Sequence, residues 1–153
     1  MNEKEKEKEN ENKYLVFKIG GGIYASPLLS IREVLEYQSP KFMPNMSPHF
    51  VGVINVRGSI VGVTDLRLKL SVPSEILPRT ALLLCDTERG SMAAIVDCVE
   101  SVAEFNSESL DRSPPVNTKT EVKYLLGVAK ANDLLITVVD LHRLLNEDEY
   151  RAA

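Results

Sequence analysis

The sequence has 153 residues, of which 44% are hydrophobic and 26% charged, so one ordinary domain with a packed core is expected. A formal net charge of -4 without a long Lys/Arg cluster argues against a nucleic-acid-binding surface. No apolar run approaches the roughly 20 residues that span a bilayer, and the charged N-terminus lacks the apolar segment of a signal peptide. We therefore expect a cytoplasmic protein without direct membrane insertion.

Residues 1–13 form a charged segment in which Glu and Lys alternate, with no apolar side chain after Met1. Such a segment buries nothing that offsets the entropy of ordering it, although Glu/Lys pairs one turn apart can stabilise a transient helix. We predict a disordered or frayed tail. A docking role for this tail is the less favoured alternative.

From Tyr14 onward, short apolar runs alternate with turn residues. Residues 14–19 are rich in β-branched and aromatic side chains, which are typical of a strand. Gly20-Gly21-Gly22 follows and predicts a hairpin turn into a second strand at 23–25. Another short run at 34–37 ends in a Pro-rich connection. The pattern therefore favours an all-β fold.

The central part of the sequence predicts a second hairpin followed by a short helix. Runs at 51–56 and 60–63 flank Arg57-Gly58-Ser59, where Gly58 can adopt the positive φ of a tight turn. Asp65 follows and can cap a short helix over 66–70, in which Leu66 and Leu70 share a face.

The second half of the sequence repeats this plan. Gly52, Asp65 and Leu66 recur as Gly127, Asp140 and Leu141 at a constant offset of 75 residues. The opening strands recur at an offset of 68, so that Gly22 corresponds to Gly90 and Glu36 to Glu104. Two ordered stretches that each keep one offset indicate an internal duplication, with halves at roughly 14–70 and 80–145 and a C-terminal end at 148–153.

Each half has about 65 residues, which is near the lower limit for an independently stable core. We therefore predict two small five-stranded β-barrels packed on a shared core, with short helices that include a C-terminal one. A groove between the packed halves is a natural place for binding.

The sequence contains no recognisable catalytic or metal-binding motif. His49 and His142 have no partners at metal-ligand spacing, and Cys85 and Cys98 lie in apolar runs typical of buried thiols. The Gly20-Gly21-Gly22 run lacks the Lys-Ser/Thr of a phosphate-binding loop. Helix capping accounts for Asp65 and Asp140, so we expect a binding module with no catalytic residue, metal or cofactor.

Several motifs stand in a characteristic order. Ile31-Arg32-Glu33-Val34 precedes the Pro-rich loop, Asn55-Val56-Arg57-Gly58 is followed by Asp65-Leu66-Arg67, and Tyr124-Leu125-Leu126-Gly127-Val128 comes near the end. In this order and spacing, the sequence resembles the CheW family, the coupling proteins of bacterial chemotaxis. The resemblance places a CheW-like domain at 14–147.

The resemblance implies a non-enzymatic adaptor with two partners. One is the regulatory domain of the histidine kinase CheA, and the other is the cytoplasmic tip of chemoreceptors, the methyl-accepting chemotaxis proteins. The alternatives are a coupling protein of a non-flagellar chemosensory system or a small-barrel nucleic-acid-binding module. Charge disfavours the nucleic-acid alternative.

The resemblance also implies which residues bind the partners. Glu33 and Arg57 match family residues that lie near each other beside the receptor groove, and an Arg fork suits a bidentate carboxylate pair. Ile31 and Val34 are candidates for the apolar floor of that groove, with ordinary core packing as the equal alternative. The remaining matched positions are expected to be structural: Gly52, Asn55, Gly58, Asp65, Leu66, Gly127 and Asp140.

Overall fold

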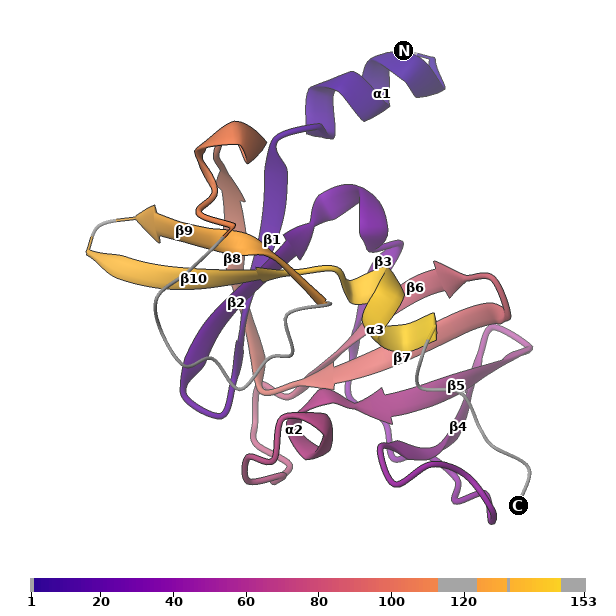
Figure 1. Cartoon of the computed structure of the whole chain (residues 1–153). Coiled ribbons are helices and arrows are strands. Elements are labelled where there is room, and N and C mark those ends of the chain that lie inside the picture. The colour runs from indigo at the N-terminus through magenta and orange to yellow at the C-terminus, as the bar shows by residue number, and fades with distance from the viewer. Residues whose placement is uncertain (1, 113–123, 132, 147–153) are drawn as a thin grey trace.

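The computed structural model describes residues 2–112, 124–131 and 133–146, which fold into two five-stranded sheets (Figure 1). The strands are β1 (Lys13–Ile19), β2 (Gly22–Pro27), β3 (Glu33–Glu36), β4 (Phe50–Val56), β5 (Ser59–Asp65), β6 (Ala81–Thr87), β7 (Gly90–Val96), β8 (Cys98–Glu104), β9 (Leu125–Ala131) and β10 (Leu134–Val139). The first sheet has the order β8-β1-β2-β10-β9 and the second β3-β6-β7-β5-β4. The all-β prediction is confirmed.

The two sheets have the same topology, as the sequence repeat predicts. In each sheet one neighbouring pair is parallel, β2 with β10 and β7 with β5, whereas the other three are antiparallel. The repeat relates β1–β5 to β6–β10 one by one, and this relation converts one strand order into the other. The shared topology supports the internal duplication.

The two sheets do not coincide with the two sequence repeats, because each sheet takes strands from both. The β1–β2 hairpin shares one sheet with β8, β9 and β10 of the second repeat, whereas β3, β4 and β5 share the other sheet with β6 and β7. Residues 14–70 and 80–145 are therefore sequence repeats but not separate folding units. This exchange lets two short repeats bury a larger joint core than either could form alone.

The sheets are also less closed than the predicted barrels. Within the described residues, no ladder joins the edge strands β3 and β4, or β8 and β9. Two isolated bridges cover edges instead, from Lys41 to Val53 and from Asp111 to Val128. The bridged segments pass close to Gly52 and Gly127, which have φ of 146° and 154°. Added side chains at these glycines would collide with Lys41 and Leu110.

Each sheet curls around its own apolar cluster, and a third cluster joins the sheets. Ile54, Leu82 and Ile95 belong to one sheet's cluster, and Val16 and Ile136 to that of the other. The shared cluster contains these buried residues among others: Phe17, Leu66, Leu83, Val96, Leu141 and Leu145. The prediction of a shared core is confirmed.

Two short helices follow corresponding strands of the two repeats. Asp65 caps α2 (Leu66–Lys69) by accepting a hydrogen bond from the Arg67 backbone N–H at 3.0 Å. Asp140 precedes α3 (Leu141–Asn146) and accepts from the Arg143 N–H at 3.1 Å. The helices are connected, since Lys69 Nζ donates to the Leu144 carbonyl at 3.1 Å. The predicted capping role of both aspartates is confirmed.

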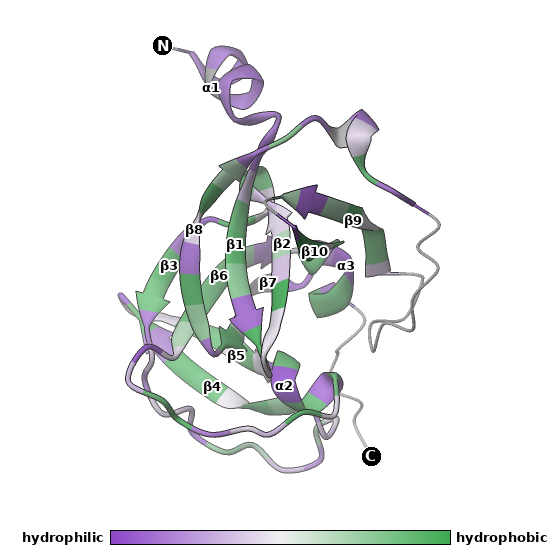
Figure 2. Cartoon of the chain, turned by 90° about the vertical axis from the view of Figure 1, so that its left-hand side faces the viewer, coloured by the Kyte–Doolittle hydropathy of each residue, from purple (hydrophilic) through white to green (hydrophobic). Residues whose placement is uncertain are grey.

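The N-terminal segment is a helix, α1 (Glu3–Asn10), and not the disordered tail expected from its composition. Asn2 accepts a hydrogen bond from the Glu5 N–H at 2.9 Å, and the Glu5 side chain accepts from the Asn2 N–H. This capping box satisfies backbone donors at the start of the helix. Figure 2 shows α1 as hydrophilic throughout, in contrast to the largely hydrophobic strands.

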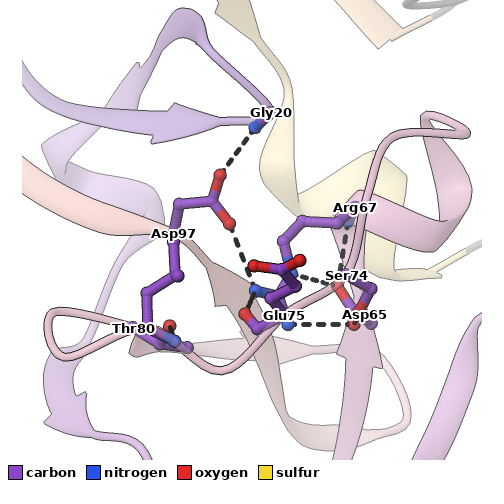
Figure 3. Close-up of polar contacts among 8 residues, drawn as sticks. Gly20, Asp65, Arg67, Ser74, Glu75, Thr80 and Asp97 are labelled. Carbon is purple, nitrogen blue, oxygen red and sulfur yellow. Dashed lines mark hydrogen bonds and ion pairs between the residues drawn. The ribbon is translucent and has the colours of Figure 1, made fainter.

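Helix α2, which follows β5, contains a buried charge, Arg67, which is fully shielded from solvent. Its Nε and Nη2 donate to the two oxygens of Asp65 at 3.0 and 3.2 Å (Figure 3). Its Nη1 donates to Asp97 at 3.1 Å and to the Glu75 carbonyl. Burial by itself lowers the pKa of Arg67, but the hydrogen bonds and charges of Asp65 and Asp97 outweigh it and raise the pKa.

The partners of Arg67 come from different parts of the fold. Asp97 lies between β7 and β8, and its second carboxylate oxygen accepts from the Gly20 N–H in the β1–β2 turn at 2.7 Å. Ser74, in the connection after α2, donates to Asp65 at 2.5 Å. One guanidinium therefore connects both sheets, α2 and the connection that follows it.

We expect replacement of Arg67 by Met to lower the free energy of unfolding by about 3–5 kcal/mol, because it leaves two carboxylates shielded without their cation. The matched control is Arg79→Met, since the Arg79 side chain is 65% exposed and its ion pair with Glu100 is long, at 3.9 Å. Urea denaturation of both variants measures the difference. Equal stability of the two variants would contradict a central role for Arg67.

Candidate functional site

The tip of the β4–β5 hairpin is the position of the Asn-x-Arg-Gly motif. Arg57 and Gly58 both have positive φ, 49° and 89°, as a tight two-residue hairpin turn requires. The Asn55 side chain accepts a hydrogen bond from the Gly58 N–H at 2.8 Å and holds this turn. The motif thus projects one long cationic side chain from a rigid tip.

Arg57 forms a bidentate ion pair with Glu33, the first residue of edge strand β3. Nη1 donates to Oε1 at 3.1 Å and Nη2 to Oε2 at 2.5 Å. The hydrogen bond from Arg57 lowers the pKa of Glu33, and the same bond raises the pKa of Arg57. The pair joins β3 to the β4–β5 hairpin at the edge where the sheet has no ladder. The Glu33 side chain remains 35% exposed and the Arg57 side chain 64% exposed, so a partner can reach both.

Of the two residues predicted to form the apolar floor of the groove, one is exposed and the other is half-buried. Val34 is 45% exposed and lies beside Glu33 on the edge strand. Ile31 is half-buried and packs against the shared core. Glu33, Arg57 and Val34 therefore all lie at one edge, which we call the β3 edge, with Val34 on the face of the strand opposite to Glu33, whereas Ile31 supports this edge from inside.

A second surface of interest lies on the same hairpin. Met43, Met46 and Met92 line an open cleft of about 450 Å³ together with Phe50, Val53, Ile60, Gly62, Arg89, Gly90 and Ser91. Every methionine of the chain except Met1 is therefore in this cleft. Ile60 is 68% exposed at its rim, and an added side chain at Gly62 would meet Phe50 and Met92. Methionine side chains adapt readily to an apolar partner surface. We call this surface the methionine cleft.

Sequence reasoning missed the methionine cleft and the buried role of Arg67. A signal existed for Arg67, because Asp65 and Arg67 are two residues apart at a helix start. The methionines gave no usable signal, since Met43 and Met46 lie in a Pro-rich loop far in sequence from Met92.

The remaining candidates lie outside both surfaces. Cys85 and Cys98 are free, and burial raises the pKa of Cys85 to about 12, which makes it an inert core thiol. His142 Nδ1 lies 3.0 Å from the Asp86 carbonyl. Among the described residues, no group of His, Cys, Asp and Glu side chains could hold a metal ion. None of the helices in this part of the chain combines the length and apolarity needed to cross a membrane.

Comparisons with known proteins agree with this geometry. The family model for the CheW-like domain matches residues 13–149. The chemotaxis protein CheW of Bacillus subtilis is 27% identical over 92% of this chain and 91% of its own length. A probable chemotaxis protein CheW of Rhizobium etli is 24% identical over 91% and 90%. The crystal structure of the scaffolding protein TtCheW from Thermoanaerobacter tengcongensis superimposes with a TM-score of 0.79, at 26% identity, over 87% of this chain and 86% of that one.

The ion pair at the β3 edge makes the titration of Glu33 a direct probe of its geometry. Because the pKa of Glu33 is lowered in the folded state, the ion pair stabilises the fold at pH values above the ordinary carboxyl pKa. That contribution is lost as the pH falls through the lowered folded-state pKa. We expect Arg57→Ala to raise the Glu33 pKa toward its ordinary value in a side-chain carbon NMR titration. Arg32→Ala is the control and should have a smaller effect, since Arg32 contributes least among the groups acting on Glu33. The opposite order would contradict the bidentate pair.

Proposed function

The chain belongs to the CheW-like domain family, whose members are non-enzymatic chemotaxis scaffolds, and from this we propose that it couples chemoreceptors to the histidine kinase CheA. It would do so in the cytoplasm, with the receptor tip on one surface and the regulatory domain of the kinase on another. Holding both partners in a fixed geometry raises their effective concentration for each other, which needs no catalytic group.

The β3 edge is the proposed receptor surface, and one comparison within the chain carries this proposal. At the positions that the repeat makes equivalent to Glu33 and Arg57, the second half has Ser101 and Asn132. The second repeat forms the same topology without this ion pair. The fold therefore does not require the pair, and a role in recognition accounts for its presence in one repeat.

The chemistry of the β3 edge suits a helical partner. Val34 offers an exposed apolar contact on β3, and the Arg57 guanidinium at the same edge can bind carboxylates or carbonyls of the partner. A helical partner that packs into a groove places apolar side chains there as anchors, and Val34 is exposed for such a contact.

The methionine cleft is the proposed kinase surface. It is more apolar than the β3 edge, it has room for one or two large side chains, and no acidic residue lines it. Because Arg57 and Ile60 lie on the same hairpin, the two proposed surfaces are adjacent but face different partners. This arrangement lets one rigid element contact receptor and kinase together.

Co-elution with fragments of both proposed partners tests the function as a whole. We expect the chain to form a ternary complex with a receptor cytoplasmic fragment and the kinase regulatory domain. Failure to bind either fragment, together with retention on nucleic acid, would overturn the proposal in favour of a nucleic-acid-binding module.

Charge reversal at Arg57 tests the receptor surface. We expect Arg57→Glu to weaken binding of the receptor fragment by about tenfold or more, because the new carboxylate repels Glu33 and removes the guanidinium. The matched control is Lys130→Glu, which makes the same charge change at an exposed position on β9. Loss of the native circular dichroism spectrum in Arg57→Glu would instead assign Arg57 a structural role.

The repeat also supplies a control for the kinase surface. Ile60 and Leu135 are equivalent in the two repeats and are similarly exposed, 68% and 55%, but only Ile60 lines the methionine cleft. We expect Ile60→Asp to weaken binding of the kinase regulatory domain by about tenfold, as loss of an apolar anchor does. Leu135→Asp should bind like the parent chain. Equal binding by both variants, measured calorimetrically, would exclude the cleft as the kinase surface.

A further inference from the structure

Helix α1 presents one face to the body of the domain. Lys4, Glu7, Lys8 and Glu11 are spaced as neighbours on one face of a helix, and with Leu29 they line an open cleft of about 340 Å³. Leu29 belongs to the short 3-10 helix η1 (Leu28–Ser30) and is 55% exposed. The cleft therefore has one apolar side chain among charged ones.

The charges on this face follow the helical repeat. Lys4 and Lys8 lie one turn apart, and so do Glu7 and Glu11, so the face has one basic and one acidic row. Side chains one turn apart on a second helix have the same spacing, which allows ion pairs between two helices lying side by side.

Little holds α1 in place within the chain itself. Its residues include no apolar side chain, so it adds nothing to the core, and its eight residues are fewer than the roughly 12–15 that an isolated helix needs in water. The capping box with Asn2 satisfies one end but does not attach the helix to the domain. A partner that fills the cleft would therefore stabilise α1 as well as bind to it.

The position of this cleft connects it to the proposed receptor surface. Helix η1 leads directly into the segment that begins β3, and the Ile31 N–H donates to the Leu28 carbonyl at 3.1 Å. Helix α1 contacts η1, which precedes β3 in the chain. Helix α1 precedes the residues that the family model matches, 13–149, whereas Leu29 lies within them.

We propose that α1 and η1 form an auxiliary clamp for a helix of the receptor tip. The clamp places an apolar side chain of the receptor on Leu29 and pairs charges one turn apart with the two rows on α1. This inference rests on the proposed receptor coupling and extends the receptor surface beyond the β3 edge. The clamp strengthens binding most at low ionic strength, because exposed ion pairs are screened by salt.

Two proline substitutions in the full chain provide a matched test. Glu7→Pro disrupts the middle of α1, whereas Glu3→Pro makes the same chemical change at the first helical position, where proline is tolerated. We expect Glu7→Pro to weaken binding of a receptor cytoplasmic fragment about three- to tenfold at low salt, and much less at 0.5 M salt, as screening predicts. Glu3→Pro should bind like the parent chain.

Leu29 gives a second, independent measurement. We expect Leu29→Asp to weaken the same binding, whereas Leu68→Asp, at an exposed position on α2, should not. The clamp is overturned if the parent chain binds the receptor fragment and Glu7→Pro binds it as tightly as Glu3→Pro does. If the parent chain does not bind the fragment at all, the receptor coupling itself is wrong, and the clamp with it.

Discussion

The buried guanidinium of Arg67 is the constraint on which the arrangement of the two sheets depends. A charge shielded from solvent must keep its hydrogen-bond partners, and those of Arg67 lie on β5, in the connection after α2 and between β7 and β8. Asp97 extends the network to the β1–β2 turn through Gly20. Through Asp97, the Arg67 side chain therefore links the β1–β2 hairpin of one sheet to α2, which follows β5 of the other sheet.

The two repeats match in backbone structure but differ in the chemistry of their side chains. Corresponding glycines, Gly52 and Gly127, permit the same close approach of a covering segment. At the position of Arg67, in contrast, the second repeat has His142, which contacts a backbone carbonyl and not a carboxylate cluster. Asp65, Arg67, Glu33 and Arg57 all belong to the first repeat, so the first repeat is the specialised one, although Asp97 of the second repeat completes the charged network.

This specialisation suits a scaffold. The β4–β5 hairpin has an ion pair at its tip and an apolar cleft on its flank, and it is anchored at its base by Asp65 and Arg67. Two partners bound to the two proposed surfaces of this one hairpin would keep a fixed relative position. Rigid placement, and not chemistry at a reacting centre, is what a coupling protein has to supply.

The sequence alone determined the strands, the turns, the two capped helices and the duplication, because these depend on local periodicity, on glycine at positive φ and on capping by Asp65 and Asp140. It also indicated Glu33 and Arg57, through the resemblance of their motifs to a family. Tertiary structure decided the rest. Which strands pair across the repeats depends on how much apolar surface each arrangement buries, and no local pattern records that choice. The burial of Arg67 and the convergence of Met43, Met46 and Met92 likewise arise from contacts between residues distant in sequence, so they became visible only in the folded chain.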